Sequence, residues 1–196
     1  MNKWLLGTII VLAILCFWGF SAYNGMITNE ETVDQSWANV QNQYQRRYDL
    51  IPNLVNTVKG YSEHESSTFE KVTEARAGLL SAQEQAQSLS DPQNNVIQFQ
   101  EAQNRLKSAL GIYVNAVHEA YPELKANENF MDLQKQLEGT ENRIATERKR
   151  YNDAVKEYNV KIRRFPGNIV AGIAGFDKKE PFAAETEAQS APHVVF

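Results

Sequence analysis

The chain has 196 residues and a formal net charge of −4, with acidic and basic residues mixed along most of its length. This length is enough for one ordinary domain with short additional segments. The mixed charges give no basic face or tail of the kind that nucleic-acid-binding proteins have. The single cysteine, Cys16, excludes an intramolecular disulfide and a cysteine-based zinc site.

The N-terminal segment is the most apolar part of the chain. Residues 4–22 carry no charge, and their number matches what a helix needs to cross roughly 30 Å of hydrocarbon. Lys3 precedes the segment, whereas the first charged residues after it are Glu30 and Glu31. We expect residues 1–27 to form a single-pass anchor in the cytoplasmic (inner) membrane. The N-terminus should lie in the cytoplasm, because the flanks of a span on that side carry the excess of basic residues.

A cleaved signal peptide is the alternative interpretation of this segment. Gly19-Phe20-Ser21 could supply the small residues that precede a cleavage site, but the apolar run is long for a signal peptide. A lipoprotein site at Cys16 is disfavoured because the bulky Leu15 precedes it. We therefore expect the segment to remain as an anchor.

Helical periodicity begins soon after the anchor. Apolar residues recur at steps of three and four, which places them on one stripe of a helix. The stripe consists of Val33, Trp37, Val40, Tyr44, Ile51, Leu54, Val58 and Tyr61. Gly60 and Tyr61 are expected to end this first long helix.

Two further helices are predicted before residue 122. Ser62-Glu63-His64-Glu65 has the pattern of a capping box that opens the second helix, so the connection is very short and the first two helices are antiparallel neighbours. Asp91-Pro92 opens the third helix, with proline at the first helical position, and Tyr121-Pro122 ends it. The apolar stripes are Phe69, Val72, Leu79 and Ala82 in the second helix, and Phe99, Leu106, Leu110, Tyr113 and Val117 in the third.

The fourth predicted helix starts near Asn127 and has the most regular pattern. Its heptad positions are Phe130, Leu137, Ile144, Tyr151, Tyr158 and Phe165, with Leu133, Val155 and Ile162 between them. Such spacing favours near-parallel, left-handed packing, and Phe165-Pro166-Gly167 ends the helix. We predict an all-α fold, in which an N-terminal transmembrane helix precedes an elongated antiparallel up-and-down four-helix bundle over residues 28–165 and a C-terminal tail.

Residues 166–196 are predicted to hold an apolar segment and the tail. The large apolar residues of the segment are Ile169, Val170, Ile173 and Phe176. The segment is too short to span a bilayer as a helix, so we expect it to cap the bundle end, the alternative being a surface-lying or partner-docking segment. The acidic stretch from Asp177 onward is interpreted as a tail. Its apolar end, a further candidate partner contact, is Val194, Val195 and Phe196.

The sequence holds no pattern that predicts catalysis. His64, His118 and His193 lie far apart, and none has the spacing of metal ligands. Nucleophile motifs, phosphate-binding glycine loops and dinucleotide fingerprints are absent from the sequence. We therefore expect a protein that is not an enzyme, with no catalytic residue, no cofactor and no metal.

One charged cluster is distinctive because Arg47 falls on the apolar stripe of the first helix. An unpaired buried arginine costs several kcal/mol, so a carboxylate should meet it. With a short turn after Gly60, antiparallel pairing sets Arg47 near Glu74, and the same register sets Asp49 near Arg76. We predict these two crossed ion pairs as structural contacts that fix the register of the two helices.

Pro52 lies within the same helix. It has no backbone N–H to donate, so it frees one carbonyl and is expected to bend the helix. The charges around Pro52 could alternatively form a ligand or partner site. The register role is favoured because polar residues buried in helix seams often specify register.

The same residues carry a resemblance to a known family. The hallmark stretch of the LemA family is similar to Trp37-Ala38, Gln43, Arg46-Arg47-Tyr48-Asp49-Leu50-Ile51-Pro52-Asn53-Leu54-Val55, Val58-Lys59-Gly60-Tyr61, His64-Glu65 and Thr73-Glu74-Ala75-Arg76. Its closing pattern resembles Tyr151-Asn152, Tyr158-Asn159 and Phe165-Pro166-Gly167-Asn168 to Gly175-Phe176. The resemblance implies a bacterial membrane protein with one N-terminal span and a four-helix bundle outside the cytosol, for which no enzymatic activity is established. Family members tend to be encoded beside membrane metalloproteases, which implies a role near envelope proteolysis by association.

These features together predict a non-catalytic, membrane-anchored scaffold or adaptor of the bacterial cell envelope. We expect it to form a homo-oligomer, to contact membrane lipid, and to bind a membrane protease or another envelope protein, with no nucleic acid as partner. One form of this hypothesis is a C-terminus that a protease captures by strand addition. The alternative function is an extracytoplasmic ligand-sensing bundle that signals through a partner.

Overall fold

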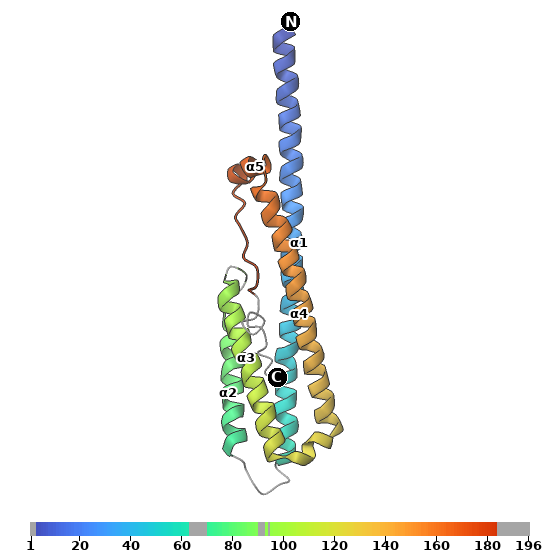
Figure 1. Ribbon diagram of the computed structural model, residues 1–196, viewed down its shortest axis with the longest axis vertical. Helices are drawn as coiled ribbons and strands as arrows, with labels where there is room; N and C mark the ends of the chain where they lie inside the picture. Colours follow the sequence, from blue (N-terminus) through green and yellow to red (C-terminus); the bar gives the residue numbers. More distant parts are fainter. Residues whose placement is uncertain (1–2, 63–69, 90–92, 94, 184–196) are drawn as a thin grey trace, which may run out of the picture. The chain divides into compact units, whose positions relative to one another are not determined.

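The computed structural model describes residues 3–62, 70–89, 93 and 95–183 of the chain. Within these residues every regular element is helical. The elements are α1 (Lys3–Ser62), α2 (Glu70–Gln87), α3 (Val96–Ala120), the short 3-10 helix η1 (Pro122–Ala126), α4 (Glu128–Arg163) and α5 (Gly167–Ala174) (Figure 1). The predicted all-α fold class is confirmed.

The chain forms two compact units, and each is described by itself. The hairpin unit comprises Met1–Val40 and Glu147–Pro181, and the bundle unit comprises Gln41–Thr146 and Phe182–Phe196. Helices α1 and α4 therefore each contribute one part of their length to each unit.

Four helical segments enclose the core of the bundle unit. They are residues 41–62 of α1, the whole of α2 and α3, and residues 128–146 of α4, and the chain direction alternates between them (Figure 1). The buried apolar residues include Tyr44, Ile51, Leu54, Val58, Val72, Leu79, Phe99, Leu106, Leu110, Tyr113, Val117, Phe130, Leu137 and Ile144. The predicted antiparallel four-helix arrangement is therefore present in this unit.

Two antiparallel helical segments form the core of the hairpin unit. The rings of Trp37 in α1 and Tyr151 in α4 are 5.3 Å apart, and Lys161 Nζ donates to the Gly25 carbonyl oxygen at 2.6 Å. A side chain at Gly25 would obstruct this contact, because a Cβ there would lie 2.7 Å from Lys161 Nζ. Glycine at position 25 thus leaves room for the end of the Lys161 side chain.

An extended segment after α5 takes part in both units. We call residues 176–183 the strap; it belongs to the hairpin unit as far as Pro181 and to the bundle unit from Phe182. Phe182 is only 3% exposed. The interpretation of the chain from Asp177 onward as a tail was therefore wrong for residues 177–183, whose backbone is hydrogen-bonded to helices although most of their side chains are exposed.

The helix ends follow the predicted signals with two corrections. Helix α3 ends before Tyr121-Pro122, and Asn127 Oδ1 accepts a hydrogen bond from the Phe130 N–H at 3.1 Å at the start of α4. The heptad pattern does not extend to Phe165, which is 77% exposed beyond the end of α4. In α2 the buried residues after Leu79 are Gln83 and Ala86 rather than Ala82.

Several other predicted features cannot be compared with the structure. The capping box beyond Ser62, the cap at Asp91-Pro92 and the core position Phe69 lie outside the described residues, as do His64 and His193.

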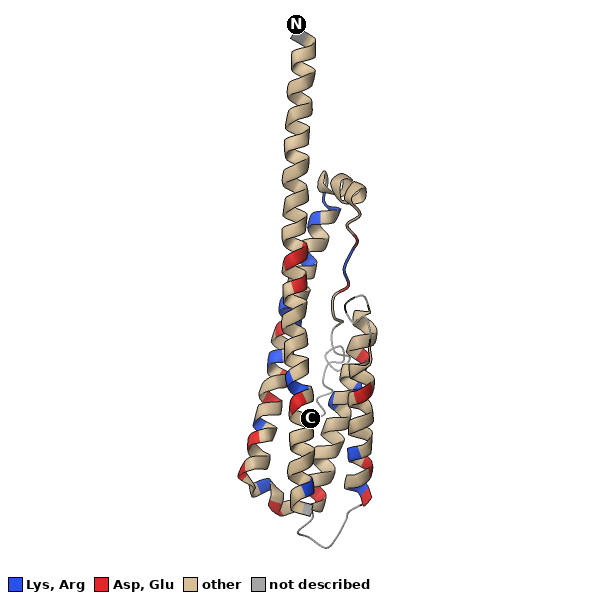
Figure 2. Cartoon of the chain, turned by 180° about the vertical axis from the view of Figure 1, so that it is seen from behind, with Lys and Arg blue, Asp and Glu red and all other residues tan. Residues whose placement is uncertain are grey.

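The first part of α1 contains a candidate membrane span. An 18-residue apolar window of this helix has a mean hydropathy of 2.3, and none of the window is buried. Figure 2 shows this part of the helix without charged residues and then acidic residues farther along. Among the described residues, α1 is the one helix that is long and apolar enough to cross a membrane.

Candidate functional site

A buried polar network lies in the core of the bundle unit, and Arg47 is its largest member. Arg47 is 1% exposed. Its Nη1 donates to Glu141 Oε1 in α4 at 2.9 Å, and its Nη2 donates to the side-chain carbonyl of Gln103 in α3. The guanidinium carbon lies 5.0 Å from the centre of the Tyr44 ring. The buried charge is thus matched by a carboxylate, an amide and an aromatic face.

Tyr48 extends the network to α2. Its hydroxyl accepts a hydrogen bond from the Gln103 side-chain amide, and its backbone carbonyl accepts one from Gln83 Nε2 at 3.3 Å. This carbonyl lies four residues before Pro52, so it is the one that proline leaves without a helical donor. Gln83 supplies that donor from α2. The sequence predicted this freed carbonyl. Helix α1 continues through Pro52, and the bend expected at this residue stays a prediction.

Every helix of the bundle unit except η1 contributes to this network. Its members are Arg47 and Tyr48 in α1, Gln83 in α2, Gln103 in α3 and Glu141 in α4. Burial raises the pKa of Tyr48, against the opposing effects of the Gln103 hydrogen bond and the Arg47 charge, so the hydroxyl stays protonated at neutral pH. A network of this kind specifies how four helices align, because its hydrogen bonds join residues of different helices.

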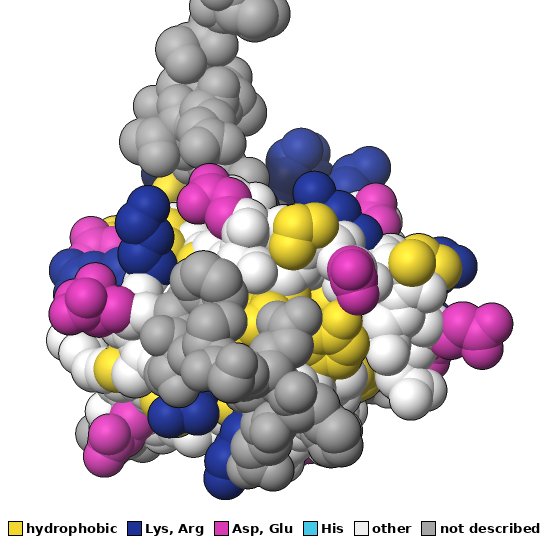
Figure 3. Space-filling view, turned by 90° about the horizontal axis from the view of Figure 1, so that it is seen from below, with side chains coloured by type: hydrophobic (Ala, Val, Ile, Leu, Met, Phe, Trp, Pro, Cys, Tyr) yellow, Lys and Arg dark blue, Asp and Glu magenta, His cyan; other side chains and the backbone are white. Residues whose placement is uncertain are grey.

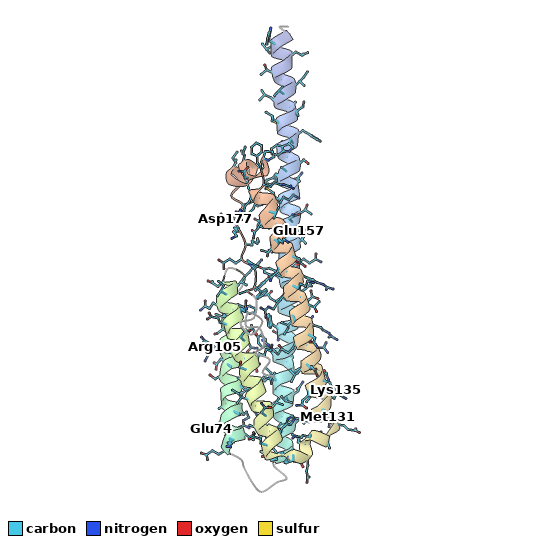
Figure 4. All side chains as sticks on the ribbon, in the orientation of Figure 1. Glu74, Arg105, Met131, Lys135, Glu157 and Asp177 are labelled. Atoms are coloured by element: carbon cyan, nitrogen blue, oxygen red, sulfur yellow. The ribbon has the colours of Figure 1, made fainter. Side chains whose placement is uncertain are left out.

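The predicted partner of Arg47 was wrong. Arg47 pairs with Glu141 rather than Glu74. The reason is register, because Gln83 of α2 donates to the Tyr48 carbonyl, so residues around Gln83 rather than Glu74 lie beside this part of α1. Figure 4 shows Glu74 near the beginning of α2, where it lines a groove between α2 and α3.

The predicted pair of Asp49 with Arg76 was wrong as well. Asp49 Oδ1 accepts a hydrogen bond from Gln45 Nε2 on the same helix at 2.8 Å. The Arg76 charge acts instead on Tyr113, where it partly opposes burial, which raises the pKa of that hydroxyl to about 12. The same change of register accounts for both corrections.

In the hairpin unit, α4 binds the backbone of the strap through two tyrosine hydroxyls. Tyr158 donates to the Asp177 carbonyl oxygen at 3.0 Å, and Tyr151 donates to the Glu180 carbonyl oxygen at 3.1 Å. Burial, and to a smaller extent nearby acidic residues, raise the pKa of each tyrosine to about 12. Both hydroxyls therefore remain donors well above neutral pH.

Two side-chain amides each bind both backbone groups of one strap residue. In the hairpin unit, Asn159 Oδ1 accepts from the Lys179 N–H at 3.1 Å and its Nδ2 donates to the Lys179 carbonyl at 2.8 Å. In the bundle unit, Gln100 Oε1 accepts from the Ala183 N–H at 2.8 Å and its Nε2 donates to the Ala183 carbonyl at 3.1 Å. We call these contacts the amide clamps.

Lys179 also fixes the strap through its side chain. Its Nζ lies 3.3 Å from Glu30 Oε1 and 3.1 Å from Asp34 Oδ1, both in α1, and 5.8 Å from the centre of the Tyr158 ring. The acidic residues that follow the apolar segment are therefore partners of the strap.

The predicted partner-contact residues have different environments in the structure. The Phe176 ring lies 5.6 Å from that of Tyr23, so the end of the segment contacts α1 within the hairpin unit, and a cap on the bundle end stays a prediction. Ile169 and Ile173 are nevertheless 53% and 84% exposed, as the surface-lying alternative requires, and Val170 is partly buried. The last three predicted contacts, Val194, Val195 and Phe196, lie outside the described residues.

Sequence reasoning missed the amides Gln83, Gln100, Gln103 and Asn159. Gln100 and Gln103 lie beside Phe99 and Leu106 on the apolar stripe of α3, and both are buried. An amide among core positions needs a hydrogen-bond partner, and that was the signal that could have identified these residues.

The surface has mixed charge and two grooves. On the face shown in Figure 3, basic and acidic side chains are interspersed around exposed apolar ones. A groove of about 580 Å³ lies between α2 and α3, and one of about 520 Å³ lies between the end of α4 and the strap. In the part of the chain that the structure describes, no group of three His, Cys, Asp or Glu residues is placed to hold a metal ion.

The fold and site define a class of helical protein with an N-terminal candidate span, a buried polar network and a strap held through its backbone. The LemA family model matches residues 36–196, well over half of the chain. This chain belongs to the LemA family.

Known relatives show the range of proteins that share this sequence pattern. Magnetosome protein MamQ 2 of Paramagnetospirillum magneticum is 29% identical over 198 residues, which cover 89% of this chain and 71% of the relative. Magnetosome protein MamQ of Magnetospirillum gryphiswaldense is 26% identical, covering 82% and 64%. Protein LemA of Metamycoplasma hominis is 22% identical, covering 83% and 69%.

Proposed function

We propose that this protein is a non-catalytic, membrane-anchored helical scaffold or adaptor of the bacterial envelope, which acts by self-association and by binding membrane partners. One observation carries the anchoring part of the proposal. The exposed apolar window of α1 and its buried residues Met26, Val33 and Trp37 lie on one helix of the hairpin unit. A span that continues into a folded core without a linker is suited to hold that core at the bilayer.

The charges that flank the span favour one orientation. Lys3 precedes the apolar segment, and Glu30, Glu31 and Asp34 follow it, which favours a cytoplasmic N-terminus. The test introduces cysteine at exposed position 138, as Glu138→Cys in a Cys16→Ser chain. A membrane-impermeant maleimide should label it in intact spheroplasts, and labelling only after lysis would show the opposite orientation.

The groove between α2 and α3 is the contact surface that we propose for a second copy of the chain. Its floor has the small residues Ala75, Gly78, Ala109 and Ala116, which allow a close helix approach. Ile112 lines the groove and is 63% exposed. The charged lining residues Lys71, Glu74 and Glu119 have both signs, so two copies related by a twofold axis can present opposite charges to each other.

Cross-linking in membranes tests this self-association. Wild-type chain should give a discrete oligomer, and Ile112→Asp should lose it because a charge replaces an apolar contact. Ile97→Asp is the matched control, because Ile97 is 56% exposed on the same helix but does not line the groove. A monomer at every concentration, or equal loss in both variants, would contradict the proposed surface.

The proposed membrane partners include quality-control proteases. The C-terminal Val194-Val195-Phe196 has the form that strand-addition grooves capture. Removal of these three residues should abolish co-purification of such a protease. Unchanged co-purification would remove this part of the proposal.

A ligand-sensing bundle is the alternative function, and the polar network is the observation that favours it. Arg47 Nε, Gln83 Oε1 and Gln43 Oε1 are buried without hydrogen-bond partners among the described residues. These atoms can each still form a hydrogen bond, so they could bind a small polar ligand. Thermal-shift screening of the full chain should then give a melting temperature that rises with ligand concentration.

A further inference from the structure

The groove at the end of α4 concentrates positive charge. Its lining comprises Asn152, Val155, Lys156, Asn159, Val160, Arg163, Arg164, Lys178 and Pro181. Four of these nine side chains are basic and the others are neutral. Within the described part of the chain, these four basic residues form no salt bridge, and the acidic strap residues Asp177 and Glu180 do not line the groove.

Contacts within the hairpin unit place this charge beside the end of the apolar segment. Lys161, which lies two residues before Arg163, reaches the Gly25 carbonyl at 2.6 Å. Gly25 follows Ala22, the last residue of the apolar run, by three residues, or about 4.5 Å along a helix. The polar headgroup layer on each side of a bilayer is roughly 5–8 Å thick. If α1 spans a membrane, the end of α4 lies at the depth of the lipid phosphates.

Helix α5 presents apolar side chains at the same level. The Phe176 ring lies 5.6 Å from the ring of Tyr23, the residue directly after the apolar run. Figure 1 shows α5 beside α1 at the end of α4. Ile169 and Ile173 lie one helical turn apart and are both exposed, as in a helix that lies in the membrane interface.

We infer that the groove lined by Lys156, Arg163, Arg164 and Lys178 binds the phosphate of an anionic phospholipid headgroup, while α5 lies in the interface beside it. Guanidinium groups match phosphate oxygens in pairs, and the neighbouring α5 gives the acyl chains an apolar surface. A free phosphate or an acidic peptide would use the charges but leave Ile169 and Ile173 uncovered. This inference rests on the proposed membrane anchoring.

Lipid binding by the full-length chain in neutral detergent tests the inference. Short-chain phosphatidylglycerol and phosphatidylcholine are titrated separately, and the bound species are counted by native mass spectrometry. The groove variant is R163Q/R164Q/K178Q. The control is R105Q/K135Q/R143Q, which removes the same charges from exposed positions of the bundle unit, two of them labelled in Figure 4.

The wild type should prefer phosphatidylglycerol. The groove variant should lose affinity for it on the order of 100-fold, because each basic residue at an anionic surface contributes roughly fivefold. The control should bind like the wild type. Equal affinity for the two lipids, equal loss in both variants, or displacement of the lipid by inorganic phosphate at comparable concentration would overturn the inference.

A second measurement reads the position of α5 and does not depend on the groove variant. An environment-sensitive fluorophore is attached to the cysteine of the Ile173→Cys variant, made in a Cys16→Ser chain. The labelled protein is placed in vesicles that contain phosphatidylglycerol. Quenchers attached to lipid near the headgroup should reduce its emission more than a water-soluble quencher does, and the reverse order would overturn the interfacial position.

Carbonate extraction of membranes separates this inference from the proposed function. Wild type and groove variant should both remain in the membrane pellet. Release of the wild type would refute the anchor and the inference with it. Retention of both proteins together with unchanged phosphatidylglycerol binding by the groove variant would refute the lipid site alone.

Discussion

In the bundle unit four helices surround the core, whereas in the hairpin unit two helices and an extended strap do so. The heptad positions of α4 differ accordingly. They are Phe130, Leu137 and Ile144 in the bundle unit and Tyr151 and Tyr158 in the hairpin unit, and all five are buried. The tyrosines occur where the packing partner is a backbone with carbonyls to satisfy. In α4 the heptad positions with a hydroxyl are therefore those whose side chains also reach the backbone of the strap.

The largest expected effect comes from the charge in the bundle core. Glu141→Ala should lower the free energy of unfolding of the bundle unit by about 2–3 kcal/mol, because it leaves the Arg47 charge buried without a carboxylate. This lies below the roughly 3–5 kcal/mol expected for a fully buried pair, since the Glu141 side chain is 25% exposed. Thermal unfolding followed by circular dichroism, together with hydrogen exchange of α2 and α3, measures this loss of stability. The exposed Glu138→Ala should be close to neutral, and equal losses would show that helix propensity dominates.

A glycine pair in α5 tests the packing of the hairpin unit. Gly167→Ala should destabilise this unit by about 1–2 kcal/mol, because its Cβ would lie 3.0 Å from the Lys161 backbone oxygen and 3.1 Å from Met26 Cε. Gly172 has no neighbour within 4 Å of such a Cβ, so Gly172→Ala should stabilise α5 by up to about 1 kcal/mol. Hydrogen exchange of α5 should move in opposite directions in the two variants. The same direction in both would show that the contact at Gly167 is unimportant.

The tyrosine hydroxyls should give the strap a dependence on alkaline pH. Tyr158→Phe should cost about 1 kcal/mol, because the Asp177 carbonyl loses its donor. The pKa of Tyr158 is raised to about 12 in the folded chain from its ordinary value of 10.0. The protonated hydroxyl therefore stabilises fully below the unfolded pKa, and this contribution is lost as pH rises through the folded pKa. As pH rises from 10.0 to about 12, hydrogen exchange of the strap in the wild type should approach that of the Tyr158→Phe variant. A difference between the two proteins that stays constant with pH would exclude titration of Tyr158.

The smallest effect should separate the two amide clamps. Asn159→Asp and Gln100→Glu keep the acceptor and remove the donor to the strap carbonyl, so each should cost about 1 kcal/mol. Exchange should rise at Lys179 in the first variant and at Ala183 in the second, since each clamp lies in its own unit. Loss of protection along the whole strap in either variant would show that the strap is held as one element.

Apolar periodicity was sufficient to predict most of the helical core. Val33, Trp37, Leu106 and Leu137 are all buried where the helical spacing placed them. Spacing determines which face of a helix is apolar, and it does so without knowledge of the neighbours.

Register and the strap could not be obtained in the same way. The burial of Arg47 and its need for a carboxylate were predictable from its place on the stripe. The identity of Glu141 depended on which helices face Arg47, and apolar spacing does not encode this. The strap was missed because much of its attachment is through its main chain, which Asn159 and Gln100 bind, and main-chain contacts leave no pattern in the strap's own sequence.

Recognition through the main chain also relaxes the sequence constraint on parts of the strap. At Ala183 the clamp would accept almost any amino acid other than proline, which has no N–H to offer. Mutational drift can therefore alter this stretch without detaching it. An exposed strap position such as Lys178 can then change while the backbone contacts keep the strap in place.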